Sequence, residues 1–177
     1  MKNRWSIAAL LVLAGVLAVT VAFAPSAALA KEYKYAGPPA FTVTYPGLYA
    51  QDPENPNKVL FRTKQDGSLP IMEINCLDPV GADGTTKVTM ANVVKEYAKK
   101  IEKSQQTQVT VASQNPITLK DGTPAVEGVC TWLYQGFLNL QSSVVTTIKD
   151  GKWVYVVIHQ NPGAPMWDAP KSLTFTK

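Results

Sequence analysis

Residues Thr123 to Gln160 read TPAVEGVCTWLYQGFLNLQSSVVTTIKDGKWVYVVIHQ, and this stretch decides the fold. Three segments rich in β-branched and aromatic residues follow one another here, separated only by short breaks that contain Gln135-Gly136 and Asp150-Gly151. Such short breaks with glycine are typical of hairpin turns between antiparallel strands. The stretch therefore predicts the central meander of an antiparallel sheet. Its expected strands are 125–134, 138–148 and 153–159.

Outside this meander the chain shows the same alternation of apolar and polar residues in shorter runs. These runs predict further strands at 41–45, 59–62, 71–77, 108–111, 116–119 and 172–175. One segment has helical periodicity instead, with Thr89 as its expected N-cap. Its apolar stripe consists of Met90, Val93, Val94, Tyr97, Ala98 and Ile101. One helix against about eight strands places the chain in the α+β class, with a mostly antiparallel sheet.

The first thirty residues have the features of an export leader. Lys2 and Arg4 precede an apolar run from Ile7 to Phe23, and Ala28-Leu29-Ala30 supplies small residues for signal peptidase. We therefore expect a signal peptide at 1–30 that is cleaved before Lys31, and a single domain at 31–177. A retained membrane anchor is the alternative. Cleavage implies a periplasmic or secreted protein with no stable membrane span.

The charge of the chain is modest once the leader is set aside. The whole sequence holds 17 basic and 13 acidic residues, a net charge of +4. Lys2 and Arg4 belong to the leader, so the remaining chain carries a net charge of about +2, too little to indicate a nucleic-acid partner.

Two cysteines remain after the leader, Cys76 and Cys130, each within a predicted strand. In an oxidising compartment they can form a disulfide, provided that the two strands are close and the side chains face each other. Two buried thiols that act as small apolar residues are the other interpretation. The sequence leaves both open.

The residue types that catalysis and metal binding need are scarce. His159 is the only histidine, and no G-x-S-x-G, H-E-x-x-H or EF-hand pattern occurs. A histidine without a neighbouring motif is more often a packed residue than a catalyst. The sequence therefore predicts a protein that is not an enzyme, with no catalytic residue, no metal site and no cofactor.

The most suggestive group of side chains is aromatic. Alternation along the last meander strand places His159 on the same face as two of these aromatic residues. The group is a candidate surface for a partner or ligand, and the other interpretation is a second hydrophobic layer on the sheet. Its members are Trp132, Tyr134, Trp153, Tyr155, His159 and Trp167.

Four short segments carry a resemblance to a known family. They are FTVTYPG at 41–47, KDGTPA at 120–125, KDGKWVY at 149–155 and KSLTF at 171–175. In this order they resemble the PsbP-like family (the Mog/PsbP fold), including bacterial DcrB-type envelope proteins. The resemblance implies an α/β/α sandwich with the antiparallel sheet between helices. The segment NPGAPMWDAP at 161–170 stands where the family has a helix, so the cover of the second sheet face is open.

The resemblance also implies a class of function. Family members are small binding or accessory proteins: PsbP serves photosystem II, and another member binds a small GTPase. We therefore expect an exported, non-enzymatic binding or accessory protein of the bacterial cell envelope, whose partner is another envelope protein. The alternative is a small-molecule binding protein, with an apolar pocket beneath Asn161 to Pro170.

Overall fold

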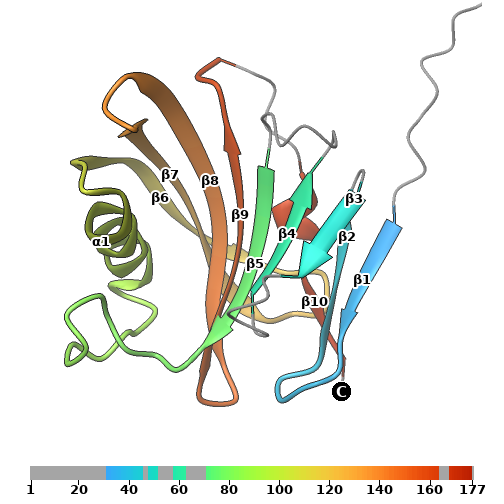
Figure 1. Cartoon of the computed structure of the whole chain (residues 1–177). Helices are drawn as coiled ribbons and strands as arrows, with labels where there is room; N and C mark the ends of the chain where they lie inside the picture. The colour runs from blue at the N-terminus through green and yellow to red at the C-terminus, as the bar shows by residue number, and fades with distance from the viewer. Residues whose placement is uncertain (1–30, 46–47, 52–57, 63–70, 164–167, 177) are drawn as a thin grey trace, which may run out of the picture.

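The computed structural model describes residues 31–45, 48–51, 58–62, 71–163 and 168–176. Figure 1 shows their arrangement. The elements in chain order are β1 (Lys31–Tyr35), β2 (Phe41–Tyr45), β3 (Leu48–Gln51), β4 (Lys58–Arg62), β5 (Ile71–Leu77), α1 (Val93–Gln105), β6 (Val109–Thr118), β7 (Pro124–Tyr134), β8 (Leu138–Lys149), β9 (Lys152–Gln160), the short 3₁₀ helix η1 (Ala169–Ser172) and β10 (Thr174–Phe175).

The predicted meander forms the centre of the larger sheet. Seven strands pair in the order β3-β4-β5-β9-β8-β7-β6, and every neighbouring pair is antiparallel. Both meander turns have the expected backbone, because Gln135 and Gly136, like Asp150 and Gly151, have positive φ angles. The expected α+β class with an antiparallel sheet is confirmed.

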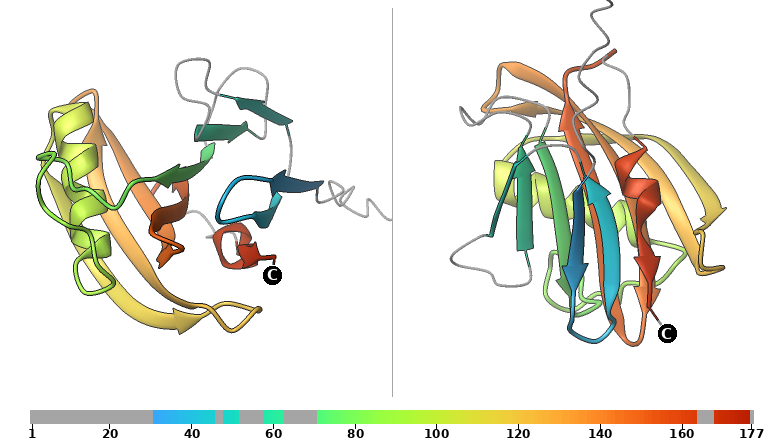
Figure 2. Two further views of the ribbon diagram at one scale, coloured as in Figure 1. Left: turned by 90° about the horizontal axis from the view of Figure 1, so that it is seen from below. Right: turned by 90° about the vertical axis from the view of Figure 1, so that its right-hand side faces the viewer.

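The two faces of the larger sheet have different covers (Figure 2). Helix α1 lies on one face. The other face is covered by a smaller antiparallel sheet, in the order β1-β2-β10, together with η1. The second face is therefore covered mainly by strands from both ends of the domain, where the resemblance implies a helix.

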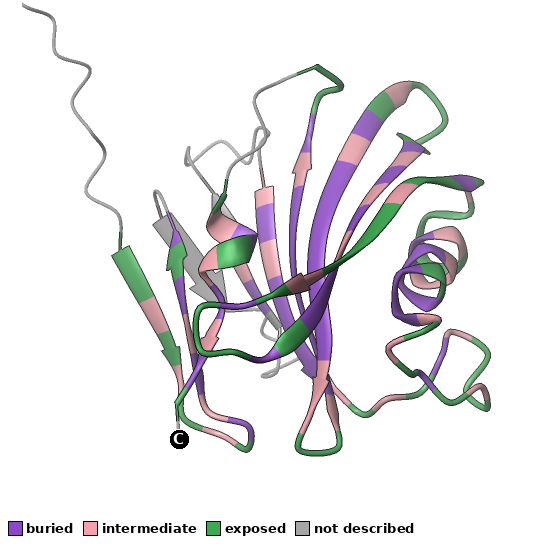
Figure 3. Ribbon diagram, turned by 180° about the vertical axis from the view of Figure 1, so that it is seen from behind, coloured by how far each residue is buried: buried purple, intermediate pink, exposed green. Residues whose placement is uncertain are grey.

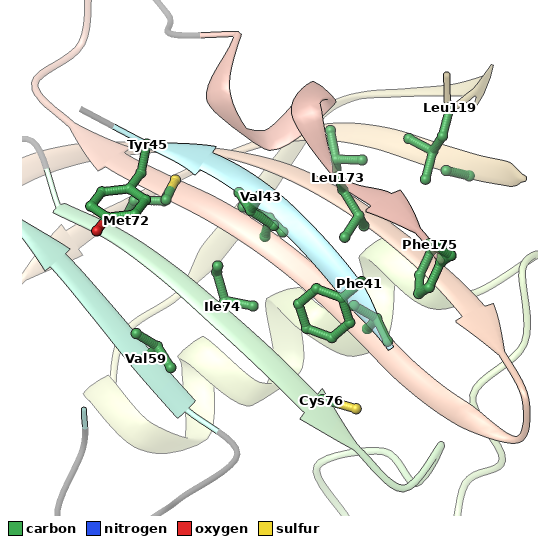
Figure 4. Packing of buried hydrophobic residues seen from close by; sticks show 14 of the residues in the cluster. Phe41, Val43, Tyr45, Val59, Met72, Ile74, Cys76, Leu119, Leu173 and Phe175 are labelled. Atoms are coloured by element: carbon green, nitrogen blue, oxygen red, sulfur yellow. The ribbon is translucent and has the colours of Figure 1, made fainter. Parts of the chain in front are cut away.

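Two separate cores result from these layers. The first lies between the two sheets, where Phe41 and Val43 of β2 face Met72 and Ile74 of β5 (Figure 4). The second lies beneath α1 and includes Val94 and Val144. Figure 3 shows that β8 and β9 are buried over most of their length, because both of their faces are covered.

Two local expectations differ from the structure. The runs 108–111 and 116–119 are parts of one strand, β6, which continues past Asn115 and carries a bulge between Val111 and Ser113. Helix α1 begins at Val93 rather than after Thr89. The Asn92 side chain accepts hydrogen bonds from the backbone and hydroxyl of Thr89, which folds the intervening residues into a turn.

The two cysteines are free and lie on opposite faces of the larger sheet. Cys76 belongs to the core between the sheets and Cys130 to the core beneath α1. Burial raises the pKa of the Cys76 thiol, and it raises the pKa of Cys130 to about 12. Of the two interpretations left open, the structure shows buried, protonated thiols, which are poor nucleophiles.

Asp121 ties the turn before β7 to the C-terminal strand. Its carboxylate accepts hydrogen bonds from the backbone N–H groups of Thr123 (2.9 Å) and Phe175 (2.7 Å). Burial acts to raise the pKa of Asp121, but these hydrogen bonds outweigh it and hold the pKa below its usual value. The carboxylate therefore stabilises the fold above about pH 4, and this contribution is lost as the pH falls through the lowered pKa.

We expect Asp121→Ala to lower the free energy of unfolding by about 1–2 kcal/mol at pH 7, because two hydrogen bonds to a charged group are lost. The difference from the parent protein should shrink at pH 3 and below, where the parent carboxyl becomes protonated. Urea denaturation at the two pH values measures both effects. Lys120→Ala, at the exposed neighbouring position, is the matched control. A difference that is equally large at both pH values would contradict the role of the carboxylate.

Candidate functional site

The face of β9 beneath α1 carries three of the predicted site residues. Trp153, Tyr155 and His159 share this face, as alternation along the strand predicts, and Trp132 of β7 joins them in the same core. Trp153 has no exposed surface. Its interpretation as part of a partner surface is therefore wrong, because α1 and the neighbouring strands enclose it.

Trp153 is held by polar as well as apolar contacts. Its indole N–H donates a hydrogen bond to the Thr146 hydroxyl at 2.8 Å. Lys100 of α1 places its ammonium 5.3 Å from the centre of the ring, within the range of a cation–π contact. Trp153 is thus a structural residue that joins α1 to the sheet.

His159 lies at the centre of a polar group that we call the His159 cluster: Glu73, Tyr97, Trp132, Ser142 and His159. Ser142 Oγ is 2.8 Å from His159 Nδ1 and accepts a hydrogen bond of 2.8 Å from the Trp132 indole. On the other side of the ring, His159 Nε2 is 3.7 Å from Glu73 Oε1. The histidine therefore sits between a hydroxyl and a carboxylate.

The register of the larger sheet assembles this cluster. Ser142 of β8 pairs directly with His159 of β9, and Glu73 of β5 pairs with Val157, two residues before the histidine. The side chains of Glu73 and His159 are 24% and 12% exposed, whereas Ser142 is fully buried. The cluster thus meets solvent mainly through its Glu73–His159 edge.

Tyr97 of α1 closes the cluster from above the sheet. Its hydroxyl faces Ser142 but makes no well-formed hydrogen bond, although it is buried. Burial raises the pKa of Tyr97 well above its usual value, and the nearby Glu73 adds to the rise. The same two causes raise the pKa of Tyr155, whose ring packs edge-on against Tyr97. Both phenols are therefore neutral at ordinary pH.

Hydrogen-bond chemistry limits where the protons of the neutral cluster can lie. An indole N–H can only donate, so Ser142 must accept from Trp132. The hydroxyl has one hydrogen, and His159 Nδ1 is an acceptor within reach. When Ser142 donates to Nδ1, neutral His159 carries its hydrogen on Nε2, directed toward Glu73.

Beside the cluster, the end of the β7–β8 hairpin exposes apolar side chains that we call the apolar tip: Leu133, Tyr134 and Phe137. Phe137 is 74% exposed, and Leu133 and Tyr134 are 40% and 36% exposed. Trp132 connects the tip to the cluster, since its ring contacts both Tyr134 (6.0 Å between centres) and His159 (5.7 Å).

Sequence reasoning named Tyr134 but missed the other two tip residues and both polar partners of His159. A signal for the tip was present, because no charged residue occurs between Glu127 and Lys149. Trp167, the remaining predicted site residue, lies outside the described residues. The predicted apolar pocket depends on the same segment and stays a prediction.

The part of the chain that the structure describes also bears on metal binding and on membrane spanning. Within it, no three His, Cys, Asp or Glu residues lie close enough together to hold a metal ion. The same part contains no helix of the length and apolar character needed to cross a bilayer.

Comparison with solved structures shows the fold. The solution structure of cyanobacterial PsbP (CyanoP) from Synechocystis matches with a TM-score of 0.63 at 14% identity, over 86% of this chain and 96% of that chain. A protein of unknown function from Pseudomonas aeruginosa, described as a putative regulator, matches with a TM-score of 0.43 at 15% identity, over 75% of this chain and 83% of that one. No family model and no curated protein matches the sequence. The expected PsbP-like fold is confirmed.

Proposed function

We propose that this chain is a non-enzymatic binding or accessory protein of the bacterial cell envelope, which docks onto another envelope protein through the apolar tip. The observation that carries this proposal is the exposure of Phe137, which leaves most of a large aromatic ring in water at the end of a hairpin. Aromatic anchors of this kind dominate the binding energy of many protein interfaces.

The backbone of the tip is suited to docking because it is held in one conformation. Gln135 and Gly136 have φ angles of 51° and 78°, and the Phe137 N–H donates to the Tyr134 carbonyl at 3.2 Å. The two positive φ angles and this hydrogen bond are typical of a type I′ turn over 134–137. Phe137 completes a three-residue connection, because Tyr134 pairs with Leu138. A rigid tip loses little conformational entropy on binding, which favours affinity.

The surroundings of Ser142 support a binding role over hydrolysis. Ser142, His159 and Glu73 have the composition of a hydrolase triad, but the Ser142 hydroxyl is fully buried and already accepts the Trp132 indole hydrogen. A nucleophile must reach the carbonyl carbon of its substrate. The cluster instead joins the base of the tip to β9 and β5.

The envelope location rests on the leader. In this leader Lys2 and Arg4 precede an apolar run from Ile7 to Phe23, and Ala28-Leu29-Ala30 stands before Lys31. Strand β1, which includes Lys31, pairs with β2 in the smaller sheet. N-terminal sequencing of the protein from its native cells tests this location, and a chain that keeps residues 1–30 and remains in the cytoplasm would contradict it.

We expect Phe137→Ser to weaken partner binding at least tenfold while the melting temperature stays unchanged, because an exposed ring adds affinity but little stability. The partner is first identified by a photo-reactive amino acid at position 137, and its affinity for each variant is then measured with purified components. Val80→Ser is the matched control, since Val80 is an exposed apolar residue in the loop before α1. Equal affinities for the parent protein and Phe137→Ser would overturn docking through the tip.

A further inference from the structure

We propose that the His159 cluster is a pH-dependent relay. When His159 takes up a proton, Ser142 redirects its hydrogen bond to Tyr97 of α1, and Trp132 carries the effect to the apolar tip. The part that concerns the tip rests on the proposed function. The relay itself depends only on contacts within the cluster.

The neutral state leaves one buried polar atom without a partner. In the Nε2–H tautomer, Ser142 accepts from Trp132 and gives its single hydrogen to His159 Nδ1, so none remains for Tyr97. The Tyr97 hydroxyl, buried and facing Ser142, is the atom without a well-formed hydrogen bond. An unpaired buried hydroxyl is unfavourable, and it is free to accept a hydrogen that Ser142 releases.

Protonation of His159 makes both ring nitrogens donors. Nδ1–H then donates to Ser142 Oγ, which now accepts two hydrogen bonds and must direct its own hydrogen elsewhere. The Tyr97 hydroxyl is the acceptor that faces it. On the other side, Nε2–H faces Glu73 at 3.7 Å and forms an ion pair with the carboxylate. The proton added to the imidazole therefore creates a new link between β8 and α1.

The structure identifies one charged and three further titratable groups of the described residues in and around the cluster. Glu73 of β5 is a charged group that faces the ring. From α1, β9 and β7 come Tyr97, Tyr155 and Cys130, and burial raises the pKa of each. These three groups stay neutral between pH 5 and 8, so Glu73 alone among the named groups supplies charge to balance an imidazolium.

Trp132 is the route to the apolar tip. Its ring lies edge-on to His159, with an angle of 85° between the planes, and edge-on to Tyr134, with an angle of 82°. A positive charge on the imidazole changes the electric field at the Trp132 ring. It also raises the number of hydrogen bonds that Ser142 accepts. We therefore expect the indole N–H and Tyr134 to respond to the same proton.

The single histidine makes the test direct. The protein is labelled with ¹⁵N-histidine and used without a polyhistidine tag, so His159 gives the only imidazole signals. The expected result is the Nε2–H tautomer at pH 8 and reversible titration of the ring between pH 8 and pH 5, with the Trp132 indole N–H shifting at the same midpoint. Imidazole signals that do not change over this range, or a titration that leaves the indole unmoved, would overturn the relay.

The link to α1 has its own measurement. Hydrogen exchange of the amides around Tyr97, corrected for the intrinsic effect of pH, should slow about fivefold when His159 becomes charged, the effect of one added hydrogen bond. Tyr97→Phe removes the acceptor without changing the ring, so the slowing should disappear while His159 still titrates. Persistence of the slowing in Tyr97→Phe would refute the relay through Ser142.

Measurements of partner affinity test the relay and the proposed function separately. If both hold, partner affinity depends on pH in the parent protein and loses that dependence in His159→Gln. If Phe137→Ser leaves affinity unchanged while the NMR and exchange results are as expected, docking through the tip is wrong and the relay stands. If affinity depends on Phe137 but His159→Gln leaves its pH dependence intact, the relay to the tip is wrong.

Discussion

Trp153→Ala is expected to lower the free energy of unfolding by about 3–5 kcal/mol, since it removes the largest fully buried side chain of the chain's described part. The substitution leaves a cavity between α1 and the sheet. It also removes the hydrogen bond to Thr146 and the contact with Lys100. Each kcal/mol corresponds to about 2–4 °C for a chain of this length, so the melting temperature should fall by roughly 6–20 °C.

The size of this effect decides how Trp153 can be used in experiments. Loss of partner binding in Trp153→Ala would report loss of the fold, not loss of a contact. Trp153→Phe is the matched variant, because it keeps most of the ring volume and removes the indole N–H; its cost should be clearly smaller. A free energy of unfolding for Trp153→Ala that lies within about 1 kcal/mol of the parent value would contradict the enclosed position of this residue.

Local patterns predicted the strands and the faces of their side chains well. Alternation placed Trp153, Tyr155 and His159 together, and glycine at Gly136 and Gly151 marked both meander turns. Alternation alone does not say what covers each face, because the cover depends on packing between distant segments. The aromatic face of β9 was therefore open to interpretation as a surface or a core until the position of α1 was known.

The polar partners of His159 show a second limit. Ser142 and Glu73 are 17 and 86 positions away in sequence, and only the pairing registers of β8 and β5 with β9 bring them to the histidine. A shift of one residue in either register would turn these side chains to the opposite face. No local pattern around His159 contains this information, so the cluster could not be predicted from the sequence.

The cover of the second sheet face could not be predicted for a similar reason: it depends on pairing between distant segments. The prolines of residues 161–170 argue against a long helix there, but they concern that segment alone. The cover is formed by η1 and by β1, β2 and β10, whose pairing joins Phe41 near the start of the domain to Phe175 near its end. Strand β10 is only two residues long, so its signal in the sequence was weak.

Gly128 sets the distance between α1 and the sheet. A Cβ atom at this position of β7 would lie 2.6 Å and 2.9 Å from the two methyl carbons of Val94, and 3.3 Å from Val144. Val94 is fully buried and β-branched, so its methyl groups cannot rotate away. Any side chain at Gly128 must therefore push the helix outward, and with it Tyr97, one turn further along.

We expect Gly128→Ala to lower the free energy of unfolding by about 1–3 kcal/mol, the usual cost of overpacking a core. Val94→Ala alone should cost about 2 kcal/mol through the cavity that it leaves. The double variant should be more stable than the sum of the two effects predicts, by about 0.5–3 kcal/mol, because each change accommodates the other. Chemical denaturation of the four proteins measures this coupling. Strictly additive effects would show that Gly128 and Val94 are not in contact, and the close approach of α1 to β7 would then be wrong.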